Sequence, residues 1–192
     1  MFNKLLNPLE MIQRVITLDD YDIQCEAENG GIDQVLVAQV CDIDYTSVTI
    51  TDREITAISM KTGKQAYRWT PDLEHAMASD NGNRSSENNS YFRTHSLMVQ
   101  FTDDEDVTAK LDEDAGRVFL VAFVKYAVAE GETAKYKAFG FFNGLRLTTS
   151  EGPVGQLYED LRGHTLNFEV KELTRALKID SAVVEALLDP PS

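Results

Sequence analysis

The sequence has few cysteines and no long apolar run. Its two cysteines, Cys25 and Cys41, are too few for a disulfide framework and lack metal-ligand spacing, so both are expected to be reduced and buried. No stretch approaches the ~20 apolar residues of a membrane-spanning helix. The apolar start of the chain is short and interrupted by Pro8, unlike a secretory signal. These absences favour a protein that is made and folded in a cytoplasm and makes no membrane contact.

Positive charge is also scarce. The chain has 18 Lys and Arg against 32 Asp and Glu, a net charge of −14 at neutral pH. Such a surface repels phosphate backbones unless positive charge is locally concentrated, and the sequence shows no basic cluster. A dedicated DNA- or RNA-binding protein is therefore disfavoured. The same charge suits a surface along which DNA passes without specific binding.

Catalytic signatures are missing as well. There is no GxSxG elbow, Walker phosphate loop or GxGxxG fingerprint. His75, His95 and His164 have no ligand spacing and are expected to be partly exposed structural residues. The acidic runs 103–106 and 112–114 are typical of solvated helix surfaces. We expect no catalytic residue, metal or cofactor; a hydrolase using a carboxylate pair stays an alternative only because acids are abundant.

What the chain does contain is a strong β pattern, clearest at residues 116–147. Residues 117–128 are almost uninterrupted in apolar character, as in a well-buried strand, although a short buried helix has a similar profile. A polar connection leads back through a strand at 135–142. Asn143-Gly144 is a strong turn dipeptide, and a further strand is expected at 145–148. The stretch predicts three neighbouring antiparallel strands.

Short strands recur along the rest of the chain, about eight in all, with turn signals every 8–12 residues. They are expected at 21–25, 35–43, 48–51, 54–60, 65–69, 91–102 and 164–170. This spacing is typical of a sandwich or barrel rather than of βαβ units. The predicted fold is mainly β (α+β), an antiparallel β-sandwich or barrel spanning residues 21–171.

Non-strand segments are expected at four places. Residues 103–116 predict one internal helix with an acidic first turn, and 79–90, SDNGNRSSENNS, predict a long polar loop. Residues 1–20 form an N-terminal arm with a short helix begun by Asn7 and Pro8. Residues 172–192 form a C-terminal arm with a short helix at 181–188. Packing of the N-terminal arm on its own domain and docking on a neighbouring subunit are equally open.

Five short motifs resemble those of a group of phage tail structural proteins. They are Gly30-Gly31-Ile32, Asp42-Ile43-Asp44, Glu54-Ile55-Thr56-Ala57-Ile58, FG..NGLRL at 139–147 and G...ED..GHTL at 155–166. The similar proteins come from phages and prophages of Bacteroidetes bacteria, crAss-like phages included. The likeness spans residues 30–170 and consists of turn and strand signatures, with no active site among them.

The resemblance implies the tail-tube superfamily. Its members have a β-sandwich or barrel with one flanking helix and a long loop, and they assemble into rings whose inner sheets line a channel. The expected function is therefore a structural protein of the virion tail or neck. It would form a hexameric or dodecameric ring with an acidic DNA channel and contact other tail or neck proteins, with the 79–90 loop and both arms at the subunit contacts.

A second hypothesis comes from a different class. Trp69 and Tyr67 alternate on one predicted strand and could, with the 79–90 loop, form the binding surface of a monomeric protein- or glycan-binding β module. Aromatic residues on strands are more often core or interface. A stable monomer with saturable ligand binding would distinguish this module from a ring subunit.

Overall fold

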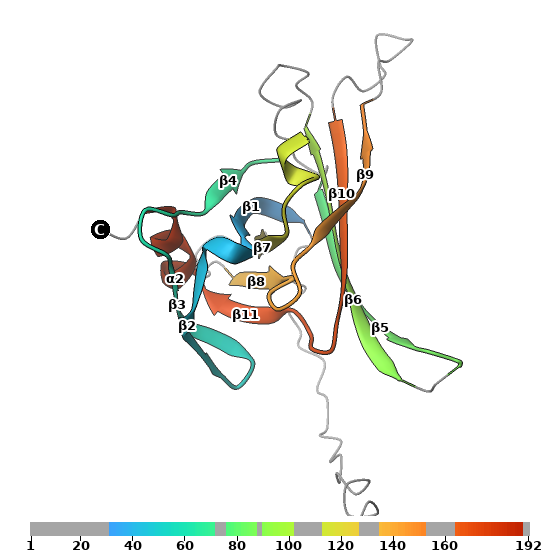
Figure 1. Ribbon diagram of the computed structural model, residues 1–192, viewed down its shortest axis with the longest axis horizontal. Coiled ribbons are helices and arrows are strands. Elements are labelled where there is room, and N and C mark those ends of the chain that lie inside the picture. Colours follow the sequence, from blue (N-terminus) through green and yellow to red (C-terminus); the bar gives the residue numbers. More distant parts are fainter. Residues whose placement is uncertain are drawn as a thin grey trace, which may run out of the picture.

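Two β-sheets packed on one another make up the fold (Figure 1). The computed structural model describes residues 31–71, 76–87, 90–101, 113–126, 135–152 and 164–189. The strands are β1 Ile32–Gln39, β2 Ile43–Thr51, β3 Glu54–Met60, β4 Tyr67–Trp69, β5 Ala76–Arg84, β6 Tyr91–Phe101, β7 Leu120–Tyr126, β8 Lys135–Phe139, β9 Arg146–Glu151, β10 His164–Glu172 and β11 Leu177–Asp180. The helical elements are η1 Val40–Asp42, α2 Ser181–Glu185 and η2 Ala186–Leu188. The mainly β sandwich predicted from the sequence is confirmed.

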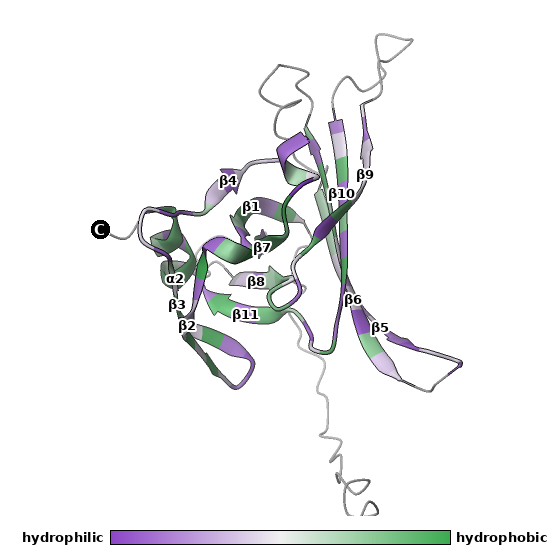
Figure 2. Ribbon diagram, viewed as in Figure 1, coloured by the Kyte–Doolittle hydropathy of each residue, from purple (hydrophilic) through white to green (hydrophobic). Residues whose placement is uncertain are grey.

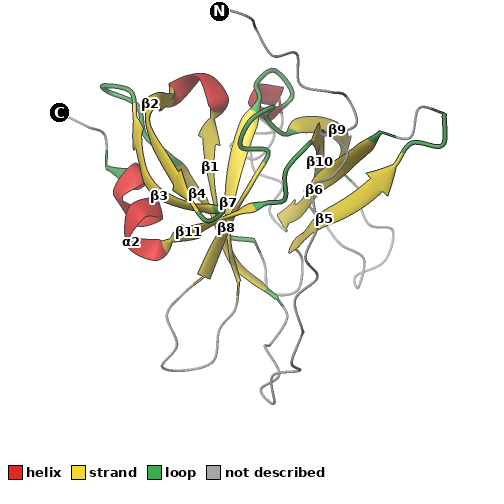
Figure 3. Ribbon diagram, turned by 90° about the horizontal axis from the view of Figure 1, so that it is seen from below, coloured by secondary structure: helices red, strands yellow, loops and turns green. Residues whose placement is uncertain are grey.

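Sheet A has seven strands in the order β2-β3-β11-β8-β7-β1-β4, and sheet B has four in the order β5-β6-β10-β9. Strand pairs are antiparallel except for β11 with β3, which run parallel. In Figure 3 sheet A curves, α2 lies beside β3 and β11, and sheet B stands apart as a second layer.

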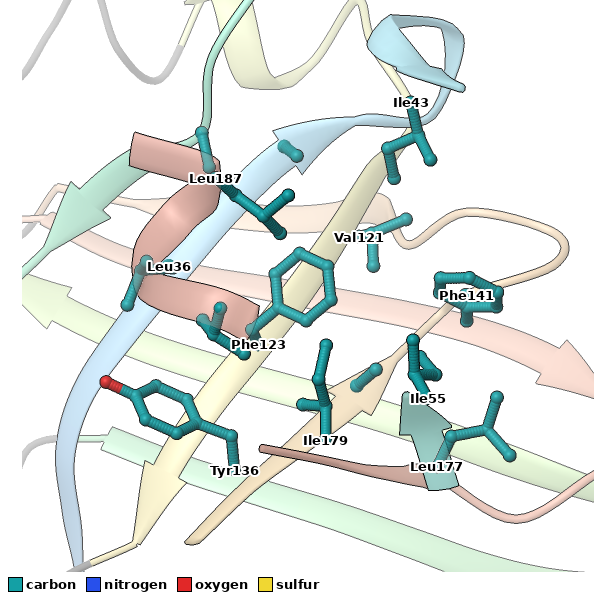
Figure 4. Packing of buried hydrophobic residues seen from close by; sticks show 14 of the residues in the cluster. Leu36, Ile43, Ile55, Val121, Phe123, Tyr136, Phe141, Leu177, Ile179 and Leu187 are labelled. Carbon is teal, nitrogen blue, oxygen red and sulfur yellow. The ribbon is translucent and has the colours of Figure 1, made fainter. Parts of the chain in front are cut away.

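The first core lies between the curved face of sheet A and the C-terminal helix (Figure 4). Its largest buried side chains include Leu36, Ile43, Phe123, Tyr136 and Leu187. Each such apolar side chain contributes about 1.5–3 kcal/mol when it is fully buried. The Tyr136 hydroxyl donates to Glu185 Oε1 at 2.8 Å, which ties β8 to α2. The α2 helix is therefore part of this core.

The second core lies between the other face of sheet A and sheet B. Trp69 packs here edge-on against Phe101, with ring centroids 5.9 Å apart, and also contacts Phe168. Residues of β10 alternate between this core and solvent, and Figure 2 shows the matching alternation of hydrophobic and hydrophilic residues along that strand. Sheet B thus buries one face and leaves the other outward.

The predicted polar loop at 79–90 is wrong for its first half. Residues 79–84 continue β5, which pairs with β6 without a break from Ala76–Val99 to Arg84–Tyr91. Polar cross-strand contacts replace the hydrophobic pattern: Ser79 Oγ lies 2.7 Å from Ser96 Oγ, and Asn83 Nδ2 donates to Thr94 Oγ1. A strand held by such pairs carries no apolar alternation in its sequence.

The three neighbouring strands predicted within 116–147 are only two. β7 pairs with β8, but β9 lies in sheet B beside β10. The turn at 140–144 carries the chain from one sheet to the other, and Gly140 and Gly144 both have positive φ, 68° and 75°. A turn is present where Asn143-Gly144 predicted one. The two strands that it connects, β8 and β9, lie in different sheets and not side by side as predicted.

The C-terminal arm predicted at 172–192 is wrong for its described part, because residues 172–189 belong to the body of the fold. β11 lies between β3 and β8 in sheet A, and Leu177, Ile179, Val184 and Leu187 are buried in the first core. The short helix predicted at 181–188 is confirmed as α2 and η2, with Asp180 Oδ1 accepting from the Ala182 amide as the N-cap.

Other predictions lie partly or wholly outside the described residues. The N-terminal arm at 1–20 and the strand at 21–25 are among them. Of the helix at 103–116, the described residues 113–115 are helical. The described residues form eleven strands, where about eight were expected for the chain.

The crossing between the sheets generates the first prediction. A Cβ at Gly140 would lie 2.7 Å from both the Leu145 amide nitrogen and Leu145 Cγ, whereas a Cβ at Gly63, with a similar φ of 73°, would meet nothing within 4 Å. Gly63→Ala should therefore cost only the left-handed backbone strain, about 1–2 kcal/mol. Gly140→Ala should cost at least about 3 kcal/mol, because backbone must also move. Urea unfolding of both variants measures the difference, and equal losses would contradict the assigned crossing geometry.

Candidate functional site

A buried polar cluster joins the two sheets at their junction. Asp80 of β5, Arg93 and His95 of β6, and Glu172 of β10 point between the layers. Arg93 Nε donates to Asp80 Oδ1, and Arg93 Nη2 donates to the Asp80 carbonyl at 2.9 Å. His95 is fully buried and lies against Phe139, with ring centroids 5.7 Å apart. The expectation that His95 is partly exposed was wrong.

His95 is fixed by backbone groups on both sides of its ring. The Gly140 amide donates to Nδ1 at 3.2 Å, which places the ring proton on Nε2. Nε2 lies 3.1 Å from the Thr174 carbonyl oxygen and 3.5 Å from Asp80 Oδ1. The ring therefore holds the inter-sheet turn and the β10–β11 turn at a fixed spacing.

Glu172 holds the same inter-sheet turn from the other side. Its Oε1 accepts from the Phe142 amide at 2.9 Å and from the Asn143 amide at 3.1 Å, while Oε2 lies 3.7 Å from His95 Nδ1. Glu172 is only 3% exposed. A buried carboxylate that accepts two backbone hydrogen bonds is stable only while the turn keeps its shape.

Asp80 and Glu172 are two carboxylates of one cluster, the kind of pair that the hydrolase hypothesis invokes, and both accept hydrogen bonds from the protein. General acid–base work requires that a substrate reach the proton-transferring atoms. The side chains of His95, Glu172 and Asp80 are 1%, 2% and 16% exposed. Both Asp80 carboxylate oxygens and Glu172 Oε1 already accept protein hydrogen bonds. The cluster links the two sheets.

The open edges of sheet B are the second feature of interest. Among the described residues β5 has a single neighbour, β6, and β9 has a single neighbour, β10. β5 is nine residues long, and its ladder with β6 shows no register shift. Its sequence, AMASDNGNR, has no lysine or proline, which are the usual means of blocking strand addition.

Tyr67 and Trp69, the aromatic residues of the binding-module hypothesis, both lie at one hollow of the surface. Trp69 is 7% exposed and belongs to the second core, while Tyr67 is 53% exposed. Both line a hollow of about 870 Å³ together with Phe101 and Leu120. No described residue of the 79–90 segment lines it, so the three parts of that hypothesis do not converge on one surface.

The two cysteines and the other two histidines were the remaining residues considered for a site. Cys41 is a free, exposed thiol, so the expectation that it is buried was wrong, and Cys25 lies outside the described residues. His164 is partly exposed as expected, and His75 also lies outside that range. Within the described ranges no three His, Cys, Asp or Glu side chains are grouped to hold a metal ion. Searched over the same residues, the structure has no helix long and apolar enough to cross a membrane.

Comparison with known proteins adds no relative: no family model, curated protein or solved structure matches this chain.

The cluster generates a pH prediction. Burial alone would raise the pKa of Asp80, but hydrogen bonds from Arg93 and the Ala176 amide, with the positive charge of Arg93, outweigh it and lower the pKa. A lowered folded-state pKa stabilises the protein above the unfolded-state value of about 3.9, and this stability is lost as pH falls through the folded-state pKa. Asp80→Asn should cost roughly 2–4 kcal/mol at pH 7 and flatten the loss of stability below pH 4.

Asp33→Asn is the matched control for this prediction. Asp33 pairs with Lys125 at 2.6 Å, but its side chain is 54% exposed, so its loss should cost under about 1 kcal/mol. Chemical unfolding of both variants between pH 3 and pH 8 gives the comparison. An Asp80→Asn protein with wild-type stability at pH 7 would show that the cluster does not hold the sheets together.

Proposed function

We propose that the chain is a non-enzymatic structural subunit that assembles into rings through the edges of sheet B, as expected for a phage tail-tube or neck protein. The observation that carries this proposal is that β5 and β9, the two outer strands of a four-stranded sheet, each have one edge without a neighbour among the described residues. An isolated chain with a long, regular, unprotected edge is prone to uncontrolled association. A ring uses such edges and leaves none free.

The strand directions of sheet B suit a closed ring. All neighbouring strands in it are antiparallel, and the number of strands is four, so β5 and β9 run in opposite directions. Joining β5 of one copy to β9 of the next, with copies related by rotation, continues the antiparallel pattern. The contact is head-to-tail and closes into a ring when the rotation divides the circle.

The dimensions suit a channel. Strands are spaced by about 4.8 Å, so six four-stranded sheets would close to a barrel about 37 Å across, and wider when the strands tilt. A ring of twelve copies would have a barrel about twice as wide. A six-membered ring would pass a DNA duplex, with the outward face of sheet B as its wall.

The side chains on that outward face favour a passive wall. Most are uncharged and polar, among them Ser79, Ser96, Thr149 and Asn167, which hydrogen-bond across the strands. The charged ones are Glu151, Glu169, Arg146 and Lys171. The Lys171 ammonium lies over the Phe92 ring at 5.1 Å, and the Arg146 guanidinium lies over the Phe119 ring at 4.7 Å. Two cations balanced by two carboxylates on the same face offer little for phosphates to bind, so DNA would slide without specific contacts. The described part of this wall is nearly neutral, so the expected acidity of the channel would come from elsewhere.

The first test is the size of the native particle. Purified full-length protein should form rings of six or twelve copies by mass photometry and negative-stain microscopy, with a central opening. A protein that stays monomeric at high concentration would eliminate the proposal and favour the binding-module alternative.

The second test identifies the joined edges by cysteine cross-linking, after Cys25 and Cys41 are replaced by Ser. One cysteine is placed on β5 at Met77, Ser79 or Asn81, and one on β9 at Thr149, all on the outward face. Pairing of β5 with β9 predicts a ladder of cross-linked copies that ends at the ring size. The single-cysteine variants are the control: they should stay uncross-linked, whereas a dimer from Ser79→Cys alone would indicate β5–β5 pairing instead.

A further inference from the structure

Four basic side chains surround one pocket in this acidic protein. Arg53 of the β2–β3 turn, Lys137 of β8, Arg175 before β11 and Lys178 of β11 line a cavity of about 390 Å³. Among the residues that the structure describes, Asp80 is the one acid that lines it with them. Four of the 18 basic residues in a chain of net charge −14 thus meet at one place, although they are distant in sequence.

The fold holds these charges together against their repulsion. Lys137 and Lys178 are direct partners in the antiparallel register of β8 and β11. Like charges directly opposite on neighbouring strands destabilise a sheet. The Lys178 amide also donates to the Arg53 carbonyl at 3.1 Å, and Arg53 has a φ of 66°, which side-chain-bearing residues rarely adopt. Placing the two lysines opposite each other therefore costs the sheet some stability.

The described residues do not neutralise the pocket. The Asp80 carboxylate already accepts hydrogen bonds from Arg93 Nε and from the Ala176 amide. Arg175 Nε lies 3.8 Å from Asp80 Oδ2, and the Arg175 side chain is 66% exposed. Glu54 is next to Lys178 in the parallel register, yet no ion pair within 4 Å involves Lys137, Lys178 or Arg53 in the described part of the chain. An anion entering the pocket would meet free positive charge.

The pocket also has an apolar floor, which distinguishes it from a simple patch of surface charge. Phe139, which is 1% exposed, is among the residues that line it, and the Lys137 ammonium lies over the Tyr126 ring at 4.9 Å from the ring centroid. Burial, with the nearby charge of Asp80, raises the pKa of Tyr126 to about 12, so its hydroxyl stays a neutral donor. Arginine forks and a hydroxyl over an apolar base suit a carboxylate on a short aliphatic stem.

The location points to the occupant. β5 contributes Ala78 and Asp80 to the pocket, so the pocket lies next to the open edge that the proposed ring would join. A neighbouring copy seated on that edge belongs to a chain with 32 acidic residues. We propose that the pocket binds carboxylates of an acidic segment from the neighbouring copy; the choice of occupant rests on the proposed ring assembly.

The test compares three full-length proteins: wild type, Lys137→Gln/Lys178→Gln, and the control Lys61→Gln/Lys64→Gln. The control removes the same charge from the turn after β3, away from the pocket. Hexaglutamate binding is measured by calorimetry at low salt. Wild type and control should bind the peptide, and the pocket variant should bind at least tenfold more weakly. The pocket variant should melt at the same temperature or higher, because repulsion between the lysines is relieved.

Assembly provides the second measurement. The pocket variant should need about tenfold more protein than wild type or control to form rings, and added salt should narrow that gap. If wild type forms rings and the pocket variant forms them equally well, the inference is overturned while the ring function stands. A wild-type chain that remains monomeric overturns the ring and the neighbouring copy as occupant. Inorganic phosphate and a short single-stranded oligonucleotide are tested in parallel, and tighter binding of either one overturns the carboxylate assignment.

Discussion

The structure depends on the burial of both faces of one pair of strands, β1 and β7. Successive residues of these strands enter opposite cores: Leu36 and Phe123 the first, Val35 and Val124 the second. Because side chains alternate along a strand, a slip of one residue in the β1–β7 register would exchange the two cores. The packing of α2 on one face of sheet A and of sheet B on the other therefore depends on that register.

Sheet B is attached to this layer by apolar packing and by one polar junction. The cluster of Asp80, Arg93, His95 and Glu172 lies where the chain crosses between sheets, and its backbone partners are the turns that make the crossing. Buried charges are tolerated only when every partner is in place, so the cluster favours one relative placement of the sheets. A firmly placed sheet B can offer its edges to other chains without opening the core.

The sequence predicts those strands whose own residues show a clear apolar pattern, and it misses those that are defined by contacts with distant residues. The apolar run at β7 indicated a buried strand because burial on both faces removes the polar residues from the pattern. β5 was missed because its outer half is held by Ser, Asn and Thr contacts that also occur in loops, and β11 because four residues are too few to show a period. The basic pocket could not be found from the sequence, since Arg53, Lys137 and Lys178 meet only once β11 is inserted between β3 and β8.

The distribution of charge on the chain relates the open edge of β5 to the basic pocket beside it. Copies of a chain with a net charge of −14 repel one another at long range, which keeps unassembled subunits apart and discourages random edge pairing. Assembly therefore requires a local attraction that acts within about a Debye length, roughly 8–10 Å at physiological salt. Positive charge gathered beside β5 provides such an attraction at the edge where strand addition would occur, and the nearly neutral outward face of sheet B provides none. The charge pattern thus favours ordered pairing at one edge over association elsewhere on the surface.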